Sequence, residues 1–277
     1  MTIDRSPSNA STYLLGHADV EIRRLILQAQ LYDGYTEHAL HLAGLRPGMR
    51  VLDVGCGPGD VSFAAARLVG PEGQVLGIDA ADGVIELART RAAEHGLNSA
   101  RLEQTTIGDL HLDEPVDAVV GRLILMHLPD PVATLRQMSG LIRPGGVIAF
   151  SEYDMTAARG VPSSPLWEAT GEIILKIFTA MGLDTAFAAT LPGLYHRAGL
   201  SAPRLALGQP VGGADHPEVL AFLVDTLQSL RPTADELGVA MDAVGDLDTL
   251  PDRIRQEIAA SGAIVTTPAL ITAWSHV

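Results

Sequence analysis

The stretch Val51-Leu-Asp-Val-Gly-Cys-Gly-Pro-Gly-Asp60 decides the fold that we expect for this chain. An apolar run typical of a buried strand leads directly into three alternating glycines, at positions 55, 57 and 59. Glycine can adopt positive φ, and it lets a ligand approach the backbone closely. In open α/β sheets, ligands bind at the carboxyl edge of the strands, where this loop would lie. The stretch therefore predicts a strand, a ligand-binding turn and a helix.

The sequence around this loop alternates between short β-branched runs and helical patterns, most clearly between residues 50 and 150. This alternation favours βαβ units and a mostly parallel sheet. Strands are expected at 50–54, 74–78, 100–105, 117–120, 147–151, 204–207 and 269–274. The helices expected between the first five strands run from Asp60 to Val69, from about Ala81 to His95, and from Pro131, with Asp130 as its N-cap, to Arg143-Pro-Gly-Gly146.

Further helices are expected outside this alternating core. Two helical segments are predicted between Asp19 and Gly44, and two follow the fifth strand, the first opened by Ser164-Pro165. Three more are predicted between Pro217 and Ser261, one of them starting at the capping box Thr233-Ala-Asp-Glu236. We therefore expect one α/β domain over 47–277, with helical insertions at about 155–200 and 213–261. A helical lid over 11–46 and a disordered tail over 1–10 would precede it.

Composition excludes several classes of protein. The 277 residues include 19 Lys and Arg against 33 Asp and Glu, a net charge of -14, whereas a nucleic-acid binder needs the opposite sign. Lys176 is the only lysine and follows no glycine-rich loop, which excludes a P-loop and a pyridoxal phosphate site. Cys56 is the only cysteine, so no internal disulfide can form. With no apolar run near the roughly 18 residues that span a bilayer, we expect a cytoplasmic protein without nucleic-acid or membrane partners.

Acidic residues mark the ends of the first three predicted strands. Asp53 lies two residues before the first glycine, and the glycine spacing is G-x-G-x-G, not the G-x-G-x-x-G of dinucleotide sites. A carboxylate at that position suits a cation better than a pyrophosphate. Asp79 ends the second strand, where it can accept hydrogen bonds from both ribose hydroxyls, and Asp109 follows the third strand. Together they predict a pocket for a nucleoside with a positively charged extension.

These residues, with Gly121-Arg-Leu-Ile-Leu-Met-His-Leu-Pro-Asp130 and Arg143-Pro-Gly-Gly146, form an ordered set that resembles the class I S-adenosylmethionine (AdoMet)-dependent methyltransferases. The resemblance covers roughly residues 45 to 152 and is greatest to the small-molecule branch, which includes ubiquinone-biosynthesis-like and actinobacterial secondary-metabolite enzymes. It implies a Rossmann-like, doubly wound, seven-stranded, mostly parallel sheet with an antiparallel last strand. N-terminal and inserted helices would form a lid. AdoMet would be the cofactor and S-adenosylhomocysteine the product.

The resemblance also implies roles for individual residues. Asp53 and the loop Gly55-Cys56-Gly57-Pro58-Gly59 would line the methionine end of the cofactor, although no chemistry is expected of Cys56. Asp79 would hold the ribose, with Ala80 beside the adenine-ribose junction. The residues implied at the adenine are Gly108, Asp109 and the backbone of Leu110.

Two candidates for the cofactor site carry further interpretations. Tyr13 is our candidate for the carboxylate end of the cofactor, from an N-terminal region that folds over the cofactor in similar enzymes. Arg122 lies at the end of the fourth strand and is a candidate cofactor contact. It could instead pair with Glu152 or with an acidic group of the substrate, and a structural ion pair is the simpler interpretation.

Candidates for the chemical step follow the fourth and fifth strands. His127 is the candidate base; the alternative is a histidine that only bonds the neighbouring backbone. Glu152 and Tyr153 would face the acceptor, unless Glu152 simply ends its strand in solvent. Trp167 and Phe178 lie in an apolar stripe that is either core or the wall of an apolar acceptor pocket. His38 and His41 lack an evident third ligand, and no metal is expected.

The function expected from these observations is AdoMet-dependent methylation of a small, partly apolar metabolite in secondary metabolism. An O or N atom is favoured over C as the methyl acceptor. The alternatives are a methyltransferase fold that uses AdoMet for other chemistry such as cyclisation, and a non-catalytic binding protein. An NAD oxidoreductase is disfavoured by the glycine spacing. The helical additions are compatible with a homodimer.

Overall fold

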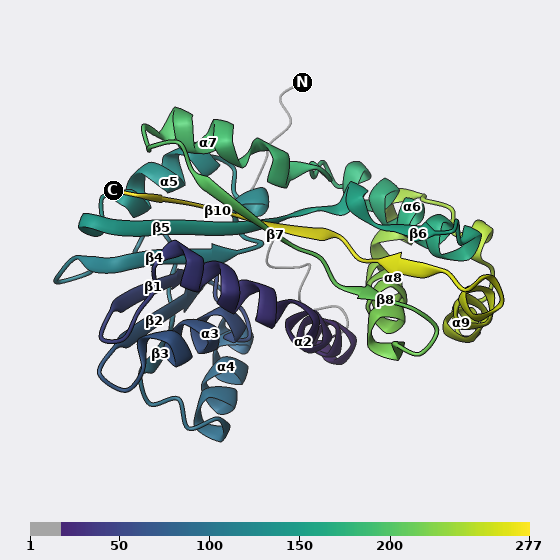
Figure 1. Ribbon diagram of the computed structural model, residues 1–277, viewed down its shortest axis with the longest axis horizontal. Coiled ribbons are helices and arrows are strands. Elements are labelled where there is room, and N and C mark those ends of the chain that lie inside the picture. The colour runs from purple at the N-terminus through teal and green to yellow at the C-terminus, as the bar shows by residue number, and fades with distance from the viewer. Residues whose placement is uncertain (1–17) are drawn as a thin grey trace.

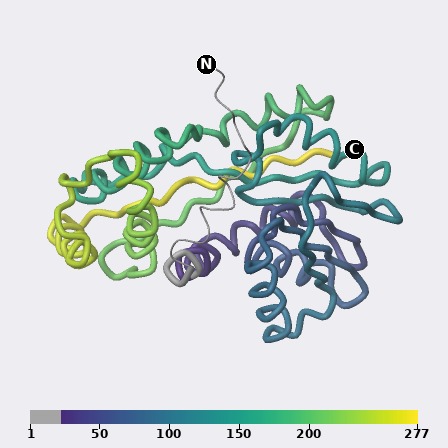
Figure 2. The backbone as a smooth tube through the Cα atoms, turned by 180° about the vertical axis from the view of Figure 1, so that it is seen from behind, coloured from purple at the N-terminus to yellow at the C-terminus, as the bar shows by residue number. Residues whose placement is uncertain are grey.

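The computed structural model describes the backbone of residues 18–277, with side chains from residue 23 onward. The predictions for the tail over 1–10 and for Tyr13 lie outside the described residues. Figures 1 and 2 show a twisted sheet with helices on both faces and a second group of helices beyond one end of its strands.

The sheet has seven strands in the order β3-β2-β1-β4-β5-β10-β7. Strand β10 is antiparallel to both of its neighbours, whereas β1 to β5 pair in parallel. The expected fold class is therefore confirmed. The strands are β1 (Arg50–Val54), β2 (Gln74–Asp79), β3 (Ala100–Gln104), β4 (Val116–Arg122), β5 (Ile142–Asp154), β7 (Arg204–Gly208) and β10 (Ala269–His276).

Both faces of the central strands are buried, as a parallel sheet requires. Because side chains alternate along a strand, Val51 packs on one face and Leu52 and Val54 on the other. Helices α2 (Ala18–Ala43), α3 (Asp60–Val69) and α4 (Asp82–Glu94) cover the face of Val51, and α5 (Pro131–Ser139) and α7 (Leu191–Ala198) cover the opposite face (Figure 1).

Several helix ends follow their predicted signals. Asp130 caps α5, because its Oδ1 accepts the backbone N–H of Ala133 at 2.8 Å, and Pro131 is the first helical residue. Pro165 likewise opens α6 (Pro165–Ala180). Gly199, with φ 83°, ends α7 in the left-handed conformation. Local capping chemistry therefore sets these boundaries.

A second apolar core lies beyond the carboxyl ends of the parallel strands. It joins α6, α8 (Pro217–Leu237) and α9 (Leu250–Ser261) through side chains such as Ile177, Leu227 and Ile254, all almost fully buried. A three-stranded sheet covers it, in the order β6 (Arg159–Val161), β9 (Ile264–Thr266) and β8 (Val211–Gly212). These strands were not predicted, because two or three residues are too few to show the alternation of polar and apolar side chains that marks a strand.

The prediction of two helical segments between Asp19 and Gly44 is wrong, since α2 is one helix of 26 residues. Gly34 lies inside it, at a position where an added Cβ would meet nothing within 4 Å. Glycine costs about 1 kcal/mol in a helix interior. Buried Tyr32, Thr36 and Leu40, spaced by four, keep the helix packed across that position.

The prediction of three helices between Pro217 and Ser261 is also wrong. Helix α8 runs through Pro232 without a break, so Thr233-Glu236 is the last part of α8 and caps nothing. An interior proline costs about 3 kcal/mol. Leu227, Leu230 and Ala234 on either side of it bury their side chains in one cluster, which offsets that cost. The region after α8 holds only the short turn η4 (Asp242–Val244) before α9 begins.

The start of β5 also differs from the prediction, because Arg143-Pro-Gly-Gly146 lies within the strand and not in a loop. Val116 pairs with Ile142, and the register shifts before Ala118 pairs with Val147. A bulge of this kind accommodates the proline and glycines. Three remaining short helical turns are η1 (Leu125–His127), η2 (Met155–Ala157) and η3 (Phe187–Thr190).

Helix α2 is anchored to the C-terminal region through Tyr32. Its buried hydroxyl lies 2.7 Å from Thr267 Oγ1 and 2.7 Å from the carbonyl oxygen of Pro268. The Tyr32 ring packs against Tyr153, with ring centroids 5.0 Å apart. This contact joins α2 to the segment between β9 and β10, about 235 positions later in the chain.

Tyr32→Phe should therefore destabilise the protein by about 1–2 kcal/mol. It keeps the ring but removes the hydroxyl, so Thr267 Oγ1 and the Pro268 carbonyl oxygen each lose a hydrogen-bond donor in a buried site. Urea unfolding followed by circular dichroism measures this loss. Tyr35→Phe is the matched control on the same helix, since the Tyr35 hydroxyl is exposed and bonds Gln209 at 3.2 Å. Equal stability of the two variants would contradict the anchoring role.

Candidate active site

The candidate site lies where the carboxyl ends of β1, β2, β4 and β5 meet. Strand β1 is central, because Asp53 pairs with Gly77 of β2 on one side and with Val120 of β4 on the other. The strand order reverses at β1 and β4, and such a switch point opens a crevice at the edge of the sheet. The predicted residues at 53–59, 79, 122 and 152 are therefore close in space.

The glycine loop joins β1 to α3 through three residues in the left-handed region. The φ angles are 69° at Gly55, 52° at Gly57 and 95° at Gly59. A Cβ at Gly55 would lie 2.6 Å from the Ile124 side chain, and one at Gly59 would lie 2.5 Å from the Phe63 ring. At Gly57 a Cβ would meet nothing within 4 Å. Protein packs against the outer two glycines, whereas the space at Gly57 is open to a ligand.

Asp79 is held in place by this loop. Its Oδ2 accepts the backbone N–H of Gly57 and its Oδ1 accepts that of Ala81, both at 3.0 Å. A carboxylate has about four lone-pair positions, so two remain for further donors. Asp79 is thus an oriented acceptor beside the open position at Gly57.

Asp53 is fully buried below the same loop. Its Oδ2 accepts the hydroxyl of Ser62 at 2.6 Å, while its Oδ1 has no hydrogen-bond partner among the described residues. Burial raises the pKa of Asp53 to about 7; Ser62 and Arg122 lower it, and Asp79 raises it. A buried carboxylate with an unused oxygen favours a cationic or hydrogen-bond-donating ligand.

The other residues predicted at the cofactor lie around this edge. Ala80 is exposed, and its carbonyl oxygen accepts a hydrogen bond from Gln104 at 3.3 Å. Asp109 is exposed and accepts the hydroxyl of Thr106 at 2.6 Å. Gly108 is exposed and Leu110 half-buried. Burial raises the pKa of the Cys56 thiol, which disfavours the thiolate.

The suggested pairing of Arg122 with Glu152 is wrong. The Nη1 of Arg122 instead bonds Asp33 Oδ1 at 3.1 Å and Thr36 Oγ1 at 2.9 Å, both on α2. The Arg122 side chain is 6% exposed and that of Asp33 is 29% exposed, so the arginine end of this ion pair is shielded from water. Helix α2 supplies the partner because it crosses the end of β4, which the sequence of β4 alone does not reveal.

Glu152 is fully buried, so the alternative that it ends its strand in solvent is wrong. Its Oε1 accepts the backbone N–H groups of Ile124 at 3.1 Å and Leu125 at 2.7 Å. Its Oε2 has no partner among the described residues. Burial raises its pKa to about 8, although those N–H groups lower it. Glu152 therefore holds a proton near neutral pH and positions the turn that carries His127.

That turn contains a strained residue. Leu123 has φ 57°, the one positive value at a non-glycine residue in the described chain. Such a conformation costs about 1 kcal/mol or more and occurs preferentially at functional sites. It redirects the chain from β4 into η1, which ends at His127. His127 is solvent-exposed, but surrounding protein and then Arg24 lower its pKa, which favours the neutral imidazole.

The three predicted acceptor contacts lie in or against two apolar clusters. Tyr153 is buried next to Tyr32, its hydroxyl has no partner in the described structure, and burial raises its pKa. Phe178 packs at the edge of the same apolar cluster. Trp167 is buried in the separate helical core with α8 and α9. Tyr153 and Trp167 thus lie in different apolar clusters, and Phe178 packs against both of them.

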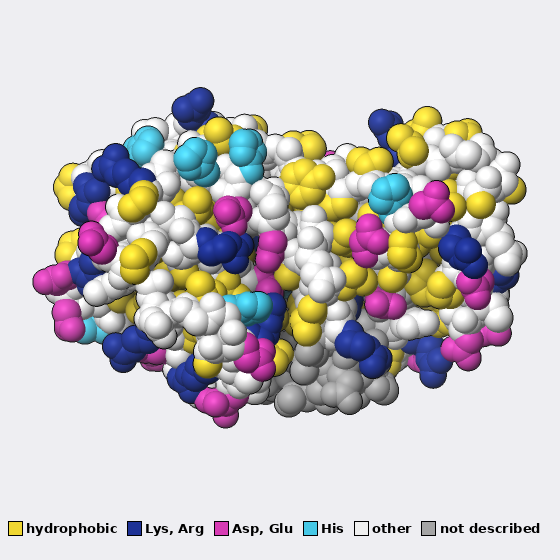
Figure 3. Space-filling view, turned by 60° about the horizontal axis from the view of Figure 1, so that its bottom comes forward, with side chains coloured by type: hydrophobic (Ala, Val, Ile, Leu, Met, Phe, Trp, Pro, Cys, Tyr) yellow, Lys and Arg dark blue, Asp and Glu magenta, His cyan; other side chains and the backbone are white. Residues whose placement is uncertain are grey.

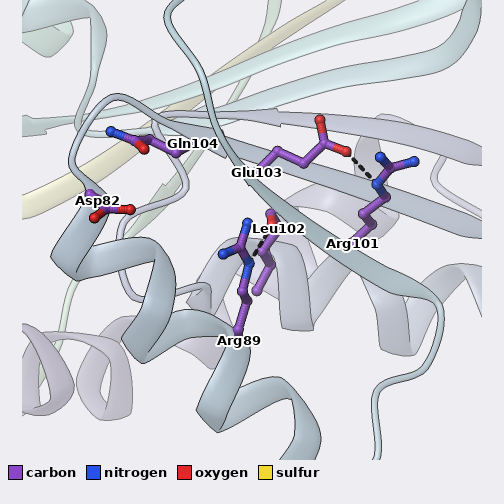
Figure 4. A pocket seen from close by; sticks show the side chains of 6 residues that line it. All are labelled: Asp82, Arg89, Arg101, Leu102, Glu103 and Gln104. Carbon is purple, nitrogen blue, oxygen red and sulfur yellow. Dashed lines mark hydrogen bonds and ion pairs between the residues drawn. The ribbon is translucent and has the colours of Figure 1, made fainter.

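A groove outside this region is lined by charges of both signs (Figure 4). It lies between α4 and the edge strand β3, and its residues are Asp82, Arg89, Arg101, Leu102, Glu103 and Gln104. Figure 3 likewise shows acidic and basic side chains interspersed over one face of the molecule. Among the side chains that the structure describes, from residue 23 onward, no group of three His, Cys, Asp or Glu could hold a metal, and none of the described helices is long and apolar enough to cross a membrane.

Sequence reasoning missed four residues that shape the site. Ser62 bonds Asp53, and Asp33 and Thr36 bond Arg122. Arg91 bonds the glycine loop from α4. Ser62 could have been found, because the first turn of α3 must lie beside the strand end that precedes it. The others depend on how helices cross the sheet, for which the sequence has no local signal.

Residues 45–178 match the family model described as a methyltransferase domain. This region belongs to the class I AdoMet-dependent methyltransferases. The ubiquinone biosynthesis O-methyltransferase of Xanthomonas campestris is 40% identical over 114 residues, which are 40% of this chain and 46% of the relative. Aklanonic acid methyltransferase DauC of Streptomyces sp. (strain C5) is 42% identical over 107 residues, 38% and 48% of the two chains. The matched segment thus spans about half the length of these relatives.

Solved structures extend the likeness in fold beyond the matched region. The Bacillus subtilis protein YcgJ has a TM-score of 0.53 at 16% identity, covering 88% of this chain and 99% of its own. The [4+2]-cyclase SpnF has a TM-score of 0.51 at 19% identity, covering 90% and 83%. At these identities the likeness concerns the fold alone.

Glu152→Gln should flatten the dependence of stability on pH. Between its ordinary pKa of 4.5 and the folded value of about 8, the folded protein keeps a proton that the unfolded chain releases. Stability therefore falls as pH rises through this window, and Glu152 should account for at least about 1 kcal/mol of the fall between pH 5 and 8. Urea unfolding at several pH values measures it. Glu236→Gln, at an exposed position, is the control and should keep the wild-type slope.

Proposed function

We propose that this protein binds AdoMet beside Gly57 and Asp79 and transfers its methyl group to an oxygen or nitrogen of a small, partly apolar metabolite. The observation that carries the proposal is the pairing of the open position at Gly57 with the oriented carboxylate of Asp79. When bound, AdoMet supplies an electrophilic methyl group and leaves as S-adenosylhomocysteine.

The chemistry of the site fits the parts of this cofactor. Asp79 has two lone-pair positions left for the ribose hydroxyls. Asp53, with an unused buried oxygen, suits the cationic methionine end, and the backbone of Gly57 can be approached closely. The residues proposed nearest the adenine are Ala80, Gly108, Asp109 and Leu110. Tyr13 remains the proposed contact at the carboxylate end of the cofactor, and Arg122 remains a candidate cofactor contact.

Apolar side chains around Tyr153 support an apolar acceptor. Tyr32 and Phe222 pack there with ring centroids 5.9 Å apart, and Phe178 is among the half-buried residues at the edge of this cluster. The hydroxyl of Tyr153, which is buried and has no hydrogen-bond partner among the described residues, is the polar group that we propose to orient a ligand. The relatives named for ubiquinone biosynthesis and aklanonic acid methylation support a small-molecule acceptor, and the latter supports a role in secondary metabolism.

Two residues are proposed to handle the proton that an acceptor hydroxyl or ammonium must lose. His127 is kept neutral by its lowered pKa, so it is ready to accept a proton at neutral pH. Glu152 is protonated up to about pH 8 and accepts a proton only above that value. His127 is therefore the better base at neutral pH, with Glu152 positioning its turn through Ile124 and Leu125.

Labelled methyl transfer tests the proposed function directly. The protein is incubated with AdoMet carrying an isotopically labelled methyl group and a panel of phenols, quinols and amines, and the products are analysed by mass spectrometry. Label in an acceptor together with release of S-adenosylhomocysteine supports methylation. Conversion of an acceptor without label transfer would favour cyclisation, and retention of AdoMet without any conversion would favour a binding protein.

Asp79→Asn should weaken binding of S-adenosylhomocysteine at least tenfold. The asparagine loses the ionised acceptor and presents an amide N–H₂ to a backbone donor, at a cost of roughly 1.5–3 kcal/mol per charged hydrogen bond. Isothermal titration calorimetry measures the affinity. Asp82→Asn is the control, because Asp82 is an exposed acid three residues later. Equal affinities of the two variants would contradict the ribose assignment.

The pH dependence of the single-turnover rate should distinguish the two proton acceptors. If His127 is the base, the rate is half-maximal below about pH 6.5 and level at higher pH, and His127→Ala lowers it roughly 10²-fold. If Glu152 is the base, the rate keeps rising through about pH 8, and Glu152→Gln removes that rise. Rapid quench from pH 5.5 to 9 with an acceptor from the panel measures both. Losses of less than threefold in both variants, with flat profiles, would show that positioning alone drives transfer.

A further inference from the structure

Arg91, on α4, makes a set of contacts to the glycine loop that neither the family match nor the proposed function assigns. Its Nη1 donates to the carbonyl oxygen of Pro58 at 2.6 Å, and its Nη2 donates to Asp60 Oδ1 at 2.6 Å. The Arg91 side chain is 16% exposed and that of Asp60 is 6% exposed. A shielded, forked contact of this kind is stronger than a surface ion pair.

The guanidinium also holds the loop through an aromatic ring. It lies 5.4 Å from the centroid of Phe63, a cation–π distance. The Phe63 ring is packed against Gly59, where a Cβ would come within 2.5 Å of it. Arg91 therefore restrains Pro58 and Asp60 directly, and Gly59 through Phe63.

The opposite side of the loop is held by Asp79, which accepts the N–H of Gly57 at 3.0 Å. Asp79 ends β2, and α4 begins three residues later at Asp82. The same βα unit thus holds the loop at two points, from its strand end and from the last turn of its helix. A loop with three left-handed glycines is costly to order, so restraint before binding favours affinity.

We propose that Arg91 is a positioning residue that keeps the glycine loop in its ligand-binding conformation. The proposal rests on the AdoMet site proposed above. Arg91 acts through Pro58, Asp60 and Phe63, to which its guanidinium is committed. Lysine cannot replace it fully, because a single ammonium group does not reproduce the planar fork that reaches a carbonyl and a carboxylate together.

The closing experiment compares Arg91→Met with Arg89→Met. Arg89 lies two positions earlier on α4 and extends toward β3, where its Nε donates to the Leu102 carbonyl at 2.9 Å, away from the glycine loop (Figure 4). Isothermal titration with S-adenosylhomocysteine should show roughly tenfold weaker binding for Arg91→Met and less than twofold for Arg89→Met. Arg91→Lys should recover part of the loss. Urea unfolding of each variant shows whether the loss of affinity exceeds any loss of stability.

Hydrogen exchange in the ligand-free protein provides the second measurement. Peptides that cover residues 55–63 should exchange faster in Arg91→Met than in wild type or Arg89→Met. If Arg91→Met does not fold, Asp60→Asn replaces it, because it removes the carboxylate partner and keeps the arginine. Wild-type affinity together with unchanged exchange in the loop variants would overturn the positioning role alone. Failure of the wild-type protein to bind S-adenosylhomocysteine would overturn the proposed function, and the positioning role with it.

Discussion

The hydrogen bond from the Gly57 N–H to the Asp79 carboxylate is the constraint on which the rest of the site depends. It joins the loop after β1 to the end of β2, 22 positions away in the chain. The bond requires the left-handed backbone at Gly57, which a side chain would strain. Because the loop leads directly into α3, its conformation also determines where Ser62 meets Asp53. One backbone geometry thus orients both carboxylates.

Buried acids are the energetic cost of this arrangement. Asp53 and Glu152 each keep one oxygen without a partner in the described structure, and burial raises both pKa values toward or above neutrality. An unsatisfied buried carboxyl group opposes folding, so these residues do not stabilise the protein at neutral pH. The core formed by the two faces of the sheet offsets that cost. Leu123, with its positive φ at the same edge, adds strain in the same place.

The sequence predicts well whatever depends on neighbouring residues. All seven strands of the main sheet, the cap at Asp130 and the glycine turn follow from local patterns, and so does the meeting of strand ends at the site. Contacts between distant elements were not predictable in this way. Arg91 meets Asp60 across 31 positions, and Tyr32 meets Thr267 across 235. The capping box at Thr233 is a local signal that misled, because α8 continues through Pro232, where its packing outweighs the broken hydrogen bond.

The two halves of the proposed reaction depend on different parts of the chain. The family match ends at residue 178, and every proposed cofactor contact in the described structure lies before it. The apolar cluster at Tyr153 also takes Tyr32 from α2 and Phe222 from α8, both outside the match. Residues outside the family region therefore shape the proposed acceptor pocket. For that reason, likeness over residues 45–178 supports the cofactor and the reaction type but does not transfer a relative's acceptor to this chain.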